Sequence, residues 1–239
     1  MSIKYVVTES PLEETAKGVE EMLSNNQSKP ILFLISGGSA FKVLDHLSPD
    51  VFGPHVTITL LDERCHQDAS NYSELTAMDY YGKVIDKGVT DMFKVNDLHF
   101  FNDCASISKS WENALREWRN ENKNGVVLAL MGIGSDGHIA GILPLVSDDM
   151  QQFEDESWVV SYEAPPEVNP YPKRITPTFT FFRSQVAEAV VYATGESKQE
   201  AIDNIFKPEG SVTKTPSRLL LELPTVTLYS DLPRNNEHV

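Results

Sequence analysis

Short apolar runs and helical hydrophobic patterns alternate along this chain. Residues 31–35 and 126–131 are apolar throughout, which is typical of strands buried on both faces of a parallel sheet. Residues 106–122 instead carry Trp111 and Trp118 at helical spacing. The same patterns predict strands at residues 3–7, 31–35, 55–61, 126–131, 187–194 and 225–229.

Helices are predicted between these strands, and polar stretches fill the rest. The expected helices are residues 11–23, 41–47, 72–81, 106–122, 196–206 and 217–221. The expected loops are residues 62–71, 147–156 and 164–172. Apolar strands separated by helices predict an α/β fold, in which a mostly parallel sheet is flanked by helices on both faces. No repeat or linker interrupts the pattern, so we expect residues 1–239 to form a single domain.

The charge balance excludes several classes of partner. The chain has 35 acidic and 20 basic residues, a net charge of −15 at pH 7. Such a surface repels nucleic-acid phosphates and anionic lipid, so we expect neither nucleic acid nor a membrane as a partner. A small anionic substrate would therefore need a pocket in which the few basic residues gather.

The two cysteines, Cys65 and Cys104, are too few for a disulfide scaffold and lack the spacing of metal ligands. We expect both as reduced thiols. No signal-peptide core and no run of about 18 apolar residues is present, so the sequence favours a cytoplasmic protein.

Unusual polar sequences follow three of the predicted strands. They are Ser-Gly-Gly-Ser at 36–39, Asp-Glu-Arg at 62–64 and Gly-Ile-Gly-Ser-Asp-Gly-His at 132–138. In parallel sheets, ligands bind beyond the carboxyl ends of the strands. We therefore expect the three segments to converge on one site.

The first two segments each allow two interpretations. Residues 36–39 can present backbone N–H groups and the Ser39 hydroxyl to a phosphate, or can simply connect a strand to a helix. Three charges at 62–64 are either exposed or part of a site. Asn71, a few residues later, can bind sugar hydroxyls or act as an ordinary turn residue.

The third segment contains a literal G-x-G-x-x-G, the dinucleotide-binding fingerprint, for which Glu163 could serve as the ribose-binding acid. Pro144 and the long spacing to Glu163 argue against a nicotinamide-dependent dehydrogenase. The alternative is a loop that presents Asp136 beside His138, whose imidazole is suited to proton transfer at neutral pH.

Taken in order, these segments resemble the motifs of the glucosamine-6-phosphate isomerase/6-phosphogluconolactonase family, in its lactonase branch. The resemblance continues through Pro-Lys-Arg-Ile-Thr at 172–176, Gly-Glu-Ser-Lys at 195–198 and Pro-Ser-Arg-Leu-Leu at 216–220. It implies a modified Rossmann-like fold of the sugar-phosphate isomerase type. It also implies hydrolysis of 6-phospho-D-glucono-1,5-lactone to 6-phospho-D-gluconate, in the oxidative pentose phosphate pathway, without a cofactor or metal.

The resemblance further implies roles for individual residues. His138 would be the base that activates water, with Asp136 and Asp62 in the polar site that orients it. Arg64 would face the charge that develops on the lactone oxygen. The residues expected to hold the 6-phosphate are Gly37, Gly38, Ser39, Arg174 and Lys198.

The deaminase/isomerase branch of the family is the first alternative. Its catalytic glutamate corresponds to Leu143 here, and its tyrosine after Asp-Glu corresponds to Arg64, so both positions favour the lactonase. A sugar-phosphate sensor without turnover is the second alternative. It is motivated by departures from the lactonase pattern at Ala40, Phe41, Cys65, His66, Gly141 and Pro177. The oligomeric state and the preferred phosphorylated lactone stay open.

Overall fold

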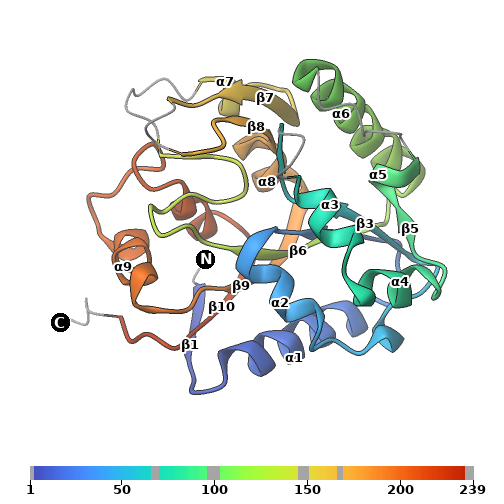
Figure 1. The fold of residues 1–239 in the computed structure, drawn as a ribbon, viewed down its shortest axis with the longest axis horizontal. Coiled ribbons are helices and arrows are strands. Elements are labelled where there is room, and N and C mark those ends of the chain that lie inside the picture. The colour runs from blue at the N-terminus through green and yellow to red at the C-terminus, as the bar shows by residue number, and fades with distance from the viewer. Residues whose placement is uncertain (1–2, 66–69, 96–102, 145–150, 166–168, 235–239) are drawn as a thin grey trace.

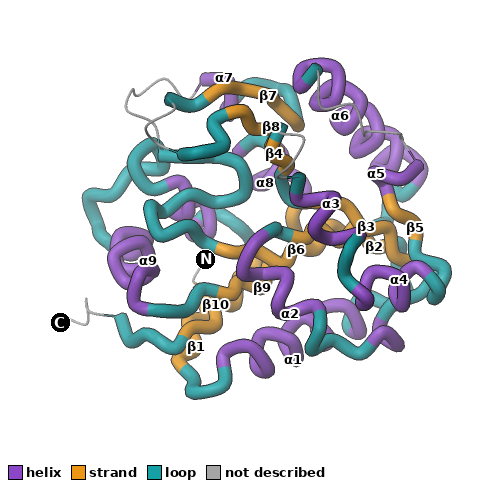
Figure 2. Tube along the Cα trace, viewed as in Figure 1, coloured by secondary structure: helices purple, strands orange, loops and turns teal. Residues whose placement is uncertain are grey.

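Seven parallel strands form the central sheet of the computed structural model, which describes residues 3–65, 70–95, 103–144, 151–165 and 169–234. Their order across the sheet is β1-β10-β9-β6-β2-β3-β5, and every pairing between neighbours is parallel. The strands are β1 (Ile3–Val7), β2 (Ile31–Ile35), β3 (Val56–Leu60), β5 (Thr90–Asp91), β6 (Val126–Gly132), β9 (Val186–Tyr192) and β10 (Thr225–Ser230). They cross the centre of the molecule (Figure 2).

Helices flank this sheet (Figure 1). They are α1 (Pro11–Ser24), α2 (Phe41–Leu44), α3 (Asn71–Thr76), α4 (Asp79–Ile85), α5 (Met92–Val95), α6 (Cys104–Glu121), α7 (Gln151–Glu154), α8 (Phe179–Gln185) and α9 (Gln199–Phe206). Short 3₁₀ turns occur at Gly38–Ala40, Pro49–Val51, Glu196–Lys198 and Pro216–Leu221. The predicted α/β class with a mostly parallel sheet is confirmed, whereas the single domain over residues 1–239 stays a prediction.

The core forms where the predicted apolar strands lie in the middle of the sheet. All five residues of β2 are buried, between β6 on one side and β3 on the other. Helix α1 begins at Pro11, a residue well suited to a first helical position, and packs on β9, β10 and β6. In the described part of the chain, no helix is both long enough and apolar enough to span a bilayer.

A second, antiparallel sheet was not predicted. It consists of β4 (Glu63–Arg64), β8 (Lys173–Pro177) and β7 (Val159–Glu163), in the order β4-β8-β7. Its register places Arg64 opposite Arg174. The small sheet lies beside α6 (Figure 1), and it joins two of the motifs that the sequence analysis singled out.

Other local predictions were wrong in detail. The single helix expected at 72–81 is two helices, because Met78 has an extended backbone where α4 begins. The loop expected at 147–156 contains α7, and α8 was missed altogether. The helix expected at 41–47 ends at Leu44.

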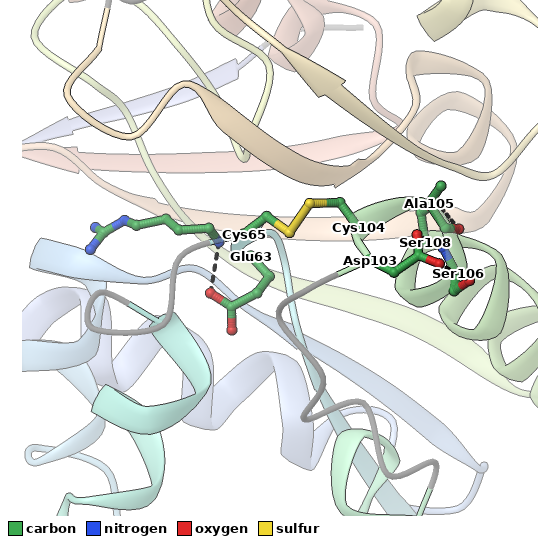
Figure 3. The surroundings of a disulfide bond; sticks show 8 residues. Glu63, Cys65, Asp103, Cys104, Ala105, Ser106 and Ser108 are labelled. Carbon is green, nitrogen blue, oxygen red and sulfur yellow. Dashed lines mark hydrogen bonds between the residues drawn. A yellow bond between two sulfur atoms is a disulfide. The ribbon is translucent and has the colours of Figure 1, made fainter.

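The expectation of two reduced thiols was also wrong, because Cys65 and Cys104 form a disulfide (Figure 3). Their Cα atoms are 6.0 Å apart, across 39 positions of sequence. The bond ties the residue that follows β4 to the first residue of α6. Sequence spacing carried no signal for this pairing, since it depends on how the two elements pack.

Replacing both cysteines with serine should lower the free energy of unfolding by about 4 kcal/mol, because the bond restricts the unfolded chain across a long loop. Urea denaturation of the wild type and the double variant measures the difference. Wild-type protein in excess dithiothreitol should match the variant. Two thiols that react freely in the untreated, folded wild type would contradict the disulfide.

Candidate active site

The candidate site lies where the chain changes direction across the sheet. From β2 the chain runs outward through β3 to β5, and then returns to β6 on the other side of β2. The loops after β2 and β6 therefore separate at their carboxyl ends, and such a switch point is where parallel α/β sheets bind ligands. A hydrogen bond from Ser36 N to Leu130 O (2.9 Å) still joins the two strands at the base of this opening.

A cavity of about 220 Å³ occupies this position. The sequence-predicted residues that line it are Gly37, Gly38, Ser39, Asp62, Arg64, Asn71, His138, Arg174 and Lys198. The predicted convergence of the three strand-end segments is thus confirmed. Asp136 does not line the cavity but contacts His138.

His138 and Asp136 form a closely coupled pair. His138 Nδ1 lies 2.6 Å from Asp136 Oδ1, and the same oxygen accepts a hydrogen bond from His138 N (3.1 Å). Because Nδ1 donates to the carboxylate, Nε2 is the ring nitrogen that can act as a base. A Cβ on Gly134 would lie 2.0 Å from Nδ1, so only glycine allows this close approach.

Burial and neighbouring charges shift the pKa values of Asp136 and of Lys198. Burial acts to raise the pKa of Asp136, but the hydrogen bond and charge of His138 outweigh it and hold that pKa below its usual value. Asp136 is therefore ionised at neutral pH. Burial lowers the pKa of Lys198, against the opposing effect of the Asp136 charge.

Asp62 and Arg174 form a buried ion pair with an N–O distance of 2.5 Å. The two residues are 3% and 5% exposed. Arg174 was predicted as a phosphate ligand, and it does line the cavity, but the adjacent carboxylate offsets its charge. Asp62 thus orients an arginine, a role that the spacing of the motifs did not indicate.

Arg64 lies opposite Arg174 in the small sheet, where two like charges face each other at a cost in free energy. Asp62 compensates one of them. The guanidinium of Arg64 lies over the ring of Tyr171, 5.2 Å from its centroid. This cation–π contact compensates part of the other charge and fixes the direction of the side chain toward the cavity.

The Ser-Gly-Gly-Ser loop turns sharply after β2. Gly38 has a φ of +66° and begins the 3₁₀ turn that leads into α2. Turn and helix together are only a few residues long, so their dipole contributes little to anion binding. A phosphate bound here would therefore be held by hydrogen bonds from this loop and by the positive charge of Lys198, rather than by the helix dipole.

Asn71 connects this loop to the next one. Its Nδ2 donates to the carbonyl of Asp62 (3.0 Å), and a Cβ on Gly37 would lie 2.7 Å from its Oδ1. Asn71 is 2% exposed, and its Oδ1 is buried without a hydrogen-bond partner. That oxygen is an acceptor in need of a donor, which a sugar hydroxyl would supply.

Two residues near the site were missed by the sequence analysis. The Tyr162 hydroxyl donates to the carbonyl of Gly141 (2.7 Å) and accepts from Leu143 N (3.1 Å), so it fixes the loop after His138. Burial raises the pKa of Tyr162 to about 12. The other residue is Glu63, which belongs to Asp-Glu-Arg but had no assigned role. Besides the adjacent Arg64 N–H, its hydrogen-bond partners lie at residues 70–72, and a short sequence motif does not reveal such contacts.

The departures from the lactonase pattern fall into distinct environments. Ala40 and Phe41 belong to the core, and Pro177 ends β8. A Cβ on Gly141 would lie 2.8 Å from Thr176 Cβ, which explains why this chain has glycine there. Cys65 is in the disulfide, and His66 lies outside the described residues.

The dinucleotide interpretation of the glycine loop is wrong. A dinucleotide fingerprint must open a helix, whereas residues 133–144 contain turns and isolated bridges between Ile133, Ile139 and Ile142. Within the described ranges, no group of three or more histidine, cysteine or acidic side chains is placed to hold a metal ion.

Comparisons with known proteins agree with this geometry. The family model described as "Glucosamine-6-phosphate isomerases/6-phosphogluconolactonase" matches residues 7–228. A 6-phosphogluconolactonase of Borreliella burgdorferi is 25% identical over 75% of this chain and 73% of its own length. A probable 6-phosphogluconolactonase 1 of Arabidopsis thaliana is 39% identical, over 39% of this chain and 34% of its own length.

Solved structures show the same fold. A 6-phosphogluconolactonase from Shewanella baltica has a TM-score of 0.72 and 21% identity, covering 96% of this chain and 98% of its own. One from Leishmania guyanensis has a TM-score of 0.69 and 20% identity, covering 100% of this chain and 99% of its own. With the family model matched over nearly the whole chain, this protein belongs to the glucosamine-6-phosphate isomerase/6-phosphogluconolactonase family.

Proposed function

We propose that this chain is a 6-phosphogluconolactonase, which hydrolyses 6-phospho-D-glucono-1,5-lactone to 6-phospho-D-gluconate in the oxidative pentose phosphate pathway. The observation that carries the proposal is the His138–Asp136 pair at a cavity that Arg64, Arg174 and Lys198 also line. In a chain of net charge −15, such a concentration of cations suits an anionic substrate. The relatives named 6-phosphogluconolactonase support the same substrate.

The chemical step needs one base and one group that stabilises negative charge. His138 Nε2 takes a proton from water as the water oxygen bonds to the lactone carbonyl carbon. Asp136, bonded to Nδ1, stabilises the imidazolium that forms. The intermediate then re-forms its carbonyl, the bond from that carbon to the ring oxygen breaks, and His138 returns the proton to the departing oxygen.

In this mechanism, Arg64 stabilises the oxyanion of that intermediate. Its guanidinium has a fixed direction over Tyr171, and a preorganised donor loses little energy to rearrangement during the reaction. The 6-phosphate binds to the loop of Gly37, Gly38 and Ser39 together with Lys198. Arg174 adds a cation whose charge Asp62 partly offsets.

The deaminase alternative requires an acid or base that the site lacks. Leu143, at the position of that branch's glutamate, is fully buried and cannot transfer a proton. The leucine at this position therefore favours a lactonase over a deaminase.

The direct test follows proton release from freshly generated 6-phosphoglucono-δ-lactone, with the spontaneous rate subtracted. We expect a rate proportional to protein concentration and no ammonia release from glucosamine 6-phosphate. No increase over the spontaneous rate would overturn the proposal. Calorimetric binding of 6-phosphogluconate without turnover would then indicate the sensor.

A further inference from the structure

Glu63 is a buried carboxylate that gathers the hydrogen-bond donors of one loop. Its Oε1 accepts from the backbone N–H groups of Arg64 and Asn71, both at 2.7 Å. Its Oε2 accepts from Tyr72 N (2.9 Å) and from the Ser70 hydroxyl (3.0 Å). The carboxylate thus binds backbone N–H groups both in β4 and at the start of α3.

The loop ends that Glu63 binds carry two of the proposed substrate-binding residues. Arg64 and Asn71 line the cavity, whereas Glu63 itself does not. The Asn71 carboxamide also packs against Gly37 and donates to Asp62, so its position affects three segments of the site. Any effect of Glu63 on the reaction must therefore pass through these neighbours.

Burying the Glu63 carboxylate costs free energy, which its hydrogen bonds only partly offset. Glu63 is 3% exposed, and burial of its charge raises its pKa to about 7 despite the four hydrogen bonds. An apolar residue would avoid that desolvation cost but would leave three backbone N–H groups without an acceptor. A carboxylate is the side chain that can accept from all four donors at once.

We propose that Glu63 is a positioning residue of the lactonase site, whose carboxylate holds Arg64 and Asn71 in the geometry that stabilises the reacting lactone. The inference rests on the proposed function and deepens it. Neither the sequence motifs nor the cavity lining assigned this residue a role.

Glu63→Gln is the sharpest variant, because glutamine keeps the shape of the side chain but has one acceptor oxygen. Its NH₂ group would face a backbone N–H, either that of Tyr72 or those of Arg64 and Asn71. We expect kcat to fall about 10- to 100-fold, the scale of a small misplacement of catalytic groups. Glu63→Asp, which keeps the charge on a shorter side chain, should recover part of the loss.

Asp91→Asn is the matched control. Asp91 is also a buried carboxylate, 4% exposed, and it accepts from the hydroxyls of Tyr72 and Tyr81 and from Phe93 N. It does not line the cavity. We expect Asp91→Asn to lower the melting temperature as Glu63→Gln does, but to change kcat less than about threefold. If Glu63→Gln and Asp91→Asn lost activity equally, Glu63 would have only a structural role, and the proposal would be overturned.

A double-mutant cycle tests the route through Arg64. If Glu63 acts by positioning Arg64, Glu63→Gln should lower kcat far less in an Arg64→Ala background than in the wild type. Full additivity of the two substitutions would overturn the proposal.

Amide hydrogen exchange, monitored by NMR, tests the positioning role of Glu63 independently of the proposed lactonase activity. In Glu63→Gln, the N–H groups of Arg64, Asn71 and Tyr72 should exchange at least about tenfold faster, while those of β2 stay protected. Unchanged exchange at the three amides would refute positioning by Glu63 even in an active lactonase. Absence of lactone hydrolysis in the wild type would instead refute the function.

Discussion

His138→Ala should lower kcat for 6-phosphoglucono-δ-lactone by about 100- to 10,000-fold, the usual contribution of a positioned general base. In the structure, His138 is the residue that combines a ring nitrogen at the cavity with a carboxylate bound to the other nitrogen. Alanine removes the proton acceptor and leaves the cations in place. KM should therefore change much less than kcat, as measured by proton release at several lactone concentrations.

Asp136→Asn isolates the second member of the pair. Asparagine can offer its NH₂ group to Nδ1, which would move the proton to Nε2 and remove the base; the loss should approach that of His138→Ala. His46→Ala is the matched control, since His46 is exposed and does not line the cavity, and it should keep wild-type activity. A His138→Ala enzyme that retains more than about a tenth of wild-type kcat would exclude His138 as the base.

The elements predicted correctly are those that depend on the hydrophobic pattern of a short stretch of sequence. Residues 31–35 and 126–131 are short apolar runs, which are typical of strands covered on both faces of a parallel sheet, and both form such strands. Once the strands are parallel, their ends must meet at one edge, so the convergence of the three motifs followed from topology.

The parts that were missed depend on contacts between distant segments. Strand β4 has two residues and exists because β8 pairs with it. The disulfide and the Asp62–Arg174 pair likewise join residues 39 and 112 positions apart. The motifs therefore predicted which residues meet, but not which of them neutralise or orient one another.

The contacts among the site residues reduce the repulsion between the cations of the cavity. Before substrate binds, Arg64, Arg174 and Lys198 share one cavity, and their mutual repulsion destabilises the folded chain. Asp62 offsets Arg174, the charge of Asp136 acts on Lys198, and Tyr171 lies under Arg64. Arg64 thus has its guanidinium over an aromatic ring at the edge of the cavity, the position from which we propose that it meets the developing oxyanion.

Arg64→Ala should accordingly lower kcat by about 100- to 1,000-fold, as loss of an oxyanion-stabilising donor does. Arg64→Lys keeps the charge but lacks the planar fork, so its activity should fall between alanine and wild type. Steady-state kinetics on the lactone, with KM and kcat determined separately, measures both. Because the interaction strengthens in the transition state, kcat should fall more than KM rises.

Arg183→Ala is the matched control for Arg64. Arg183 also lies over an aromatic ring, Phe179, at 5.3 Å from its centroid, and it pairs with Glu154 and Glu222 away from the cavity. Its loss should leave kcat within about twofold of wild type, since partly exposed ion pairs contribute little. If Arg64→Ala instead raised KM tenfold or more at unchanged kcat, Arg64 would bind the substrate in its ground state, and another group would have to stabilise the oxyanion.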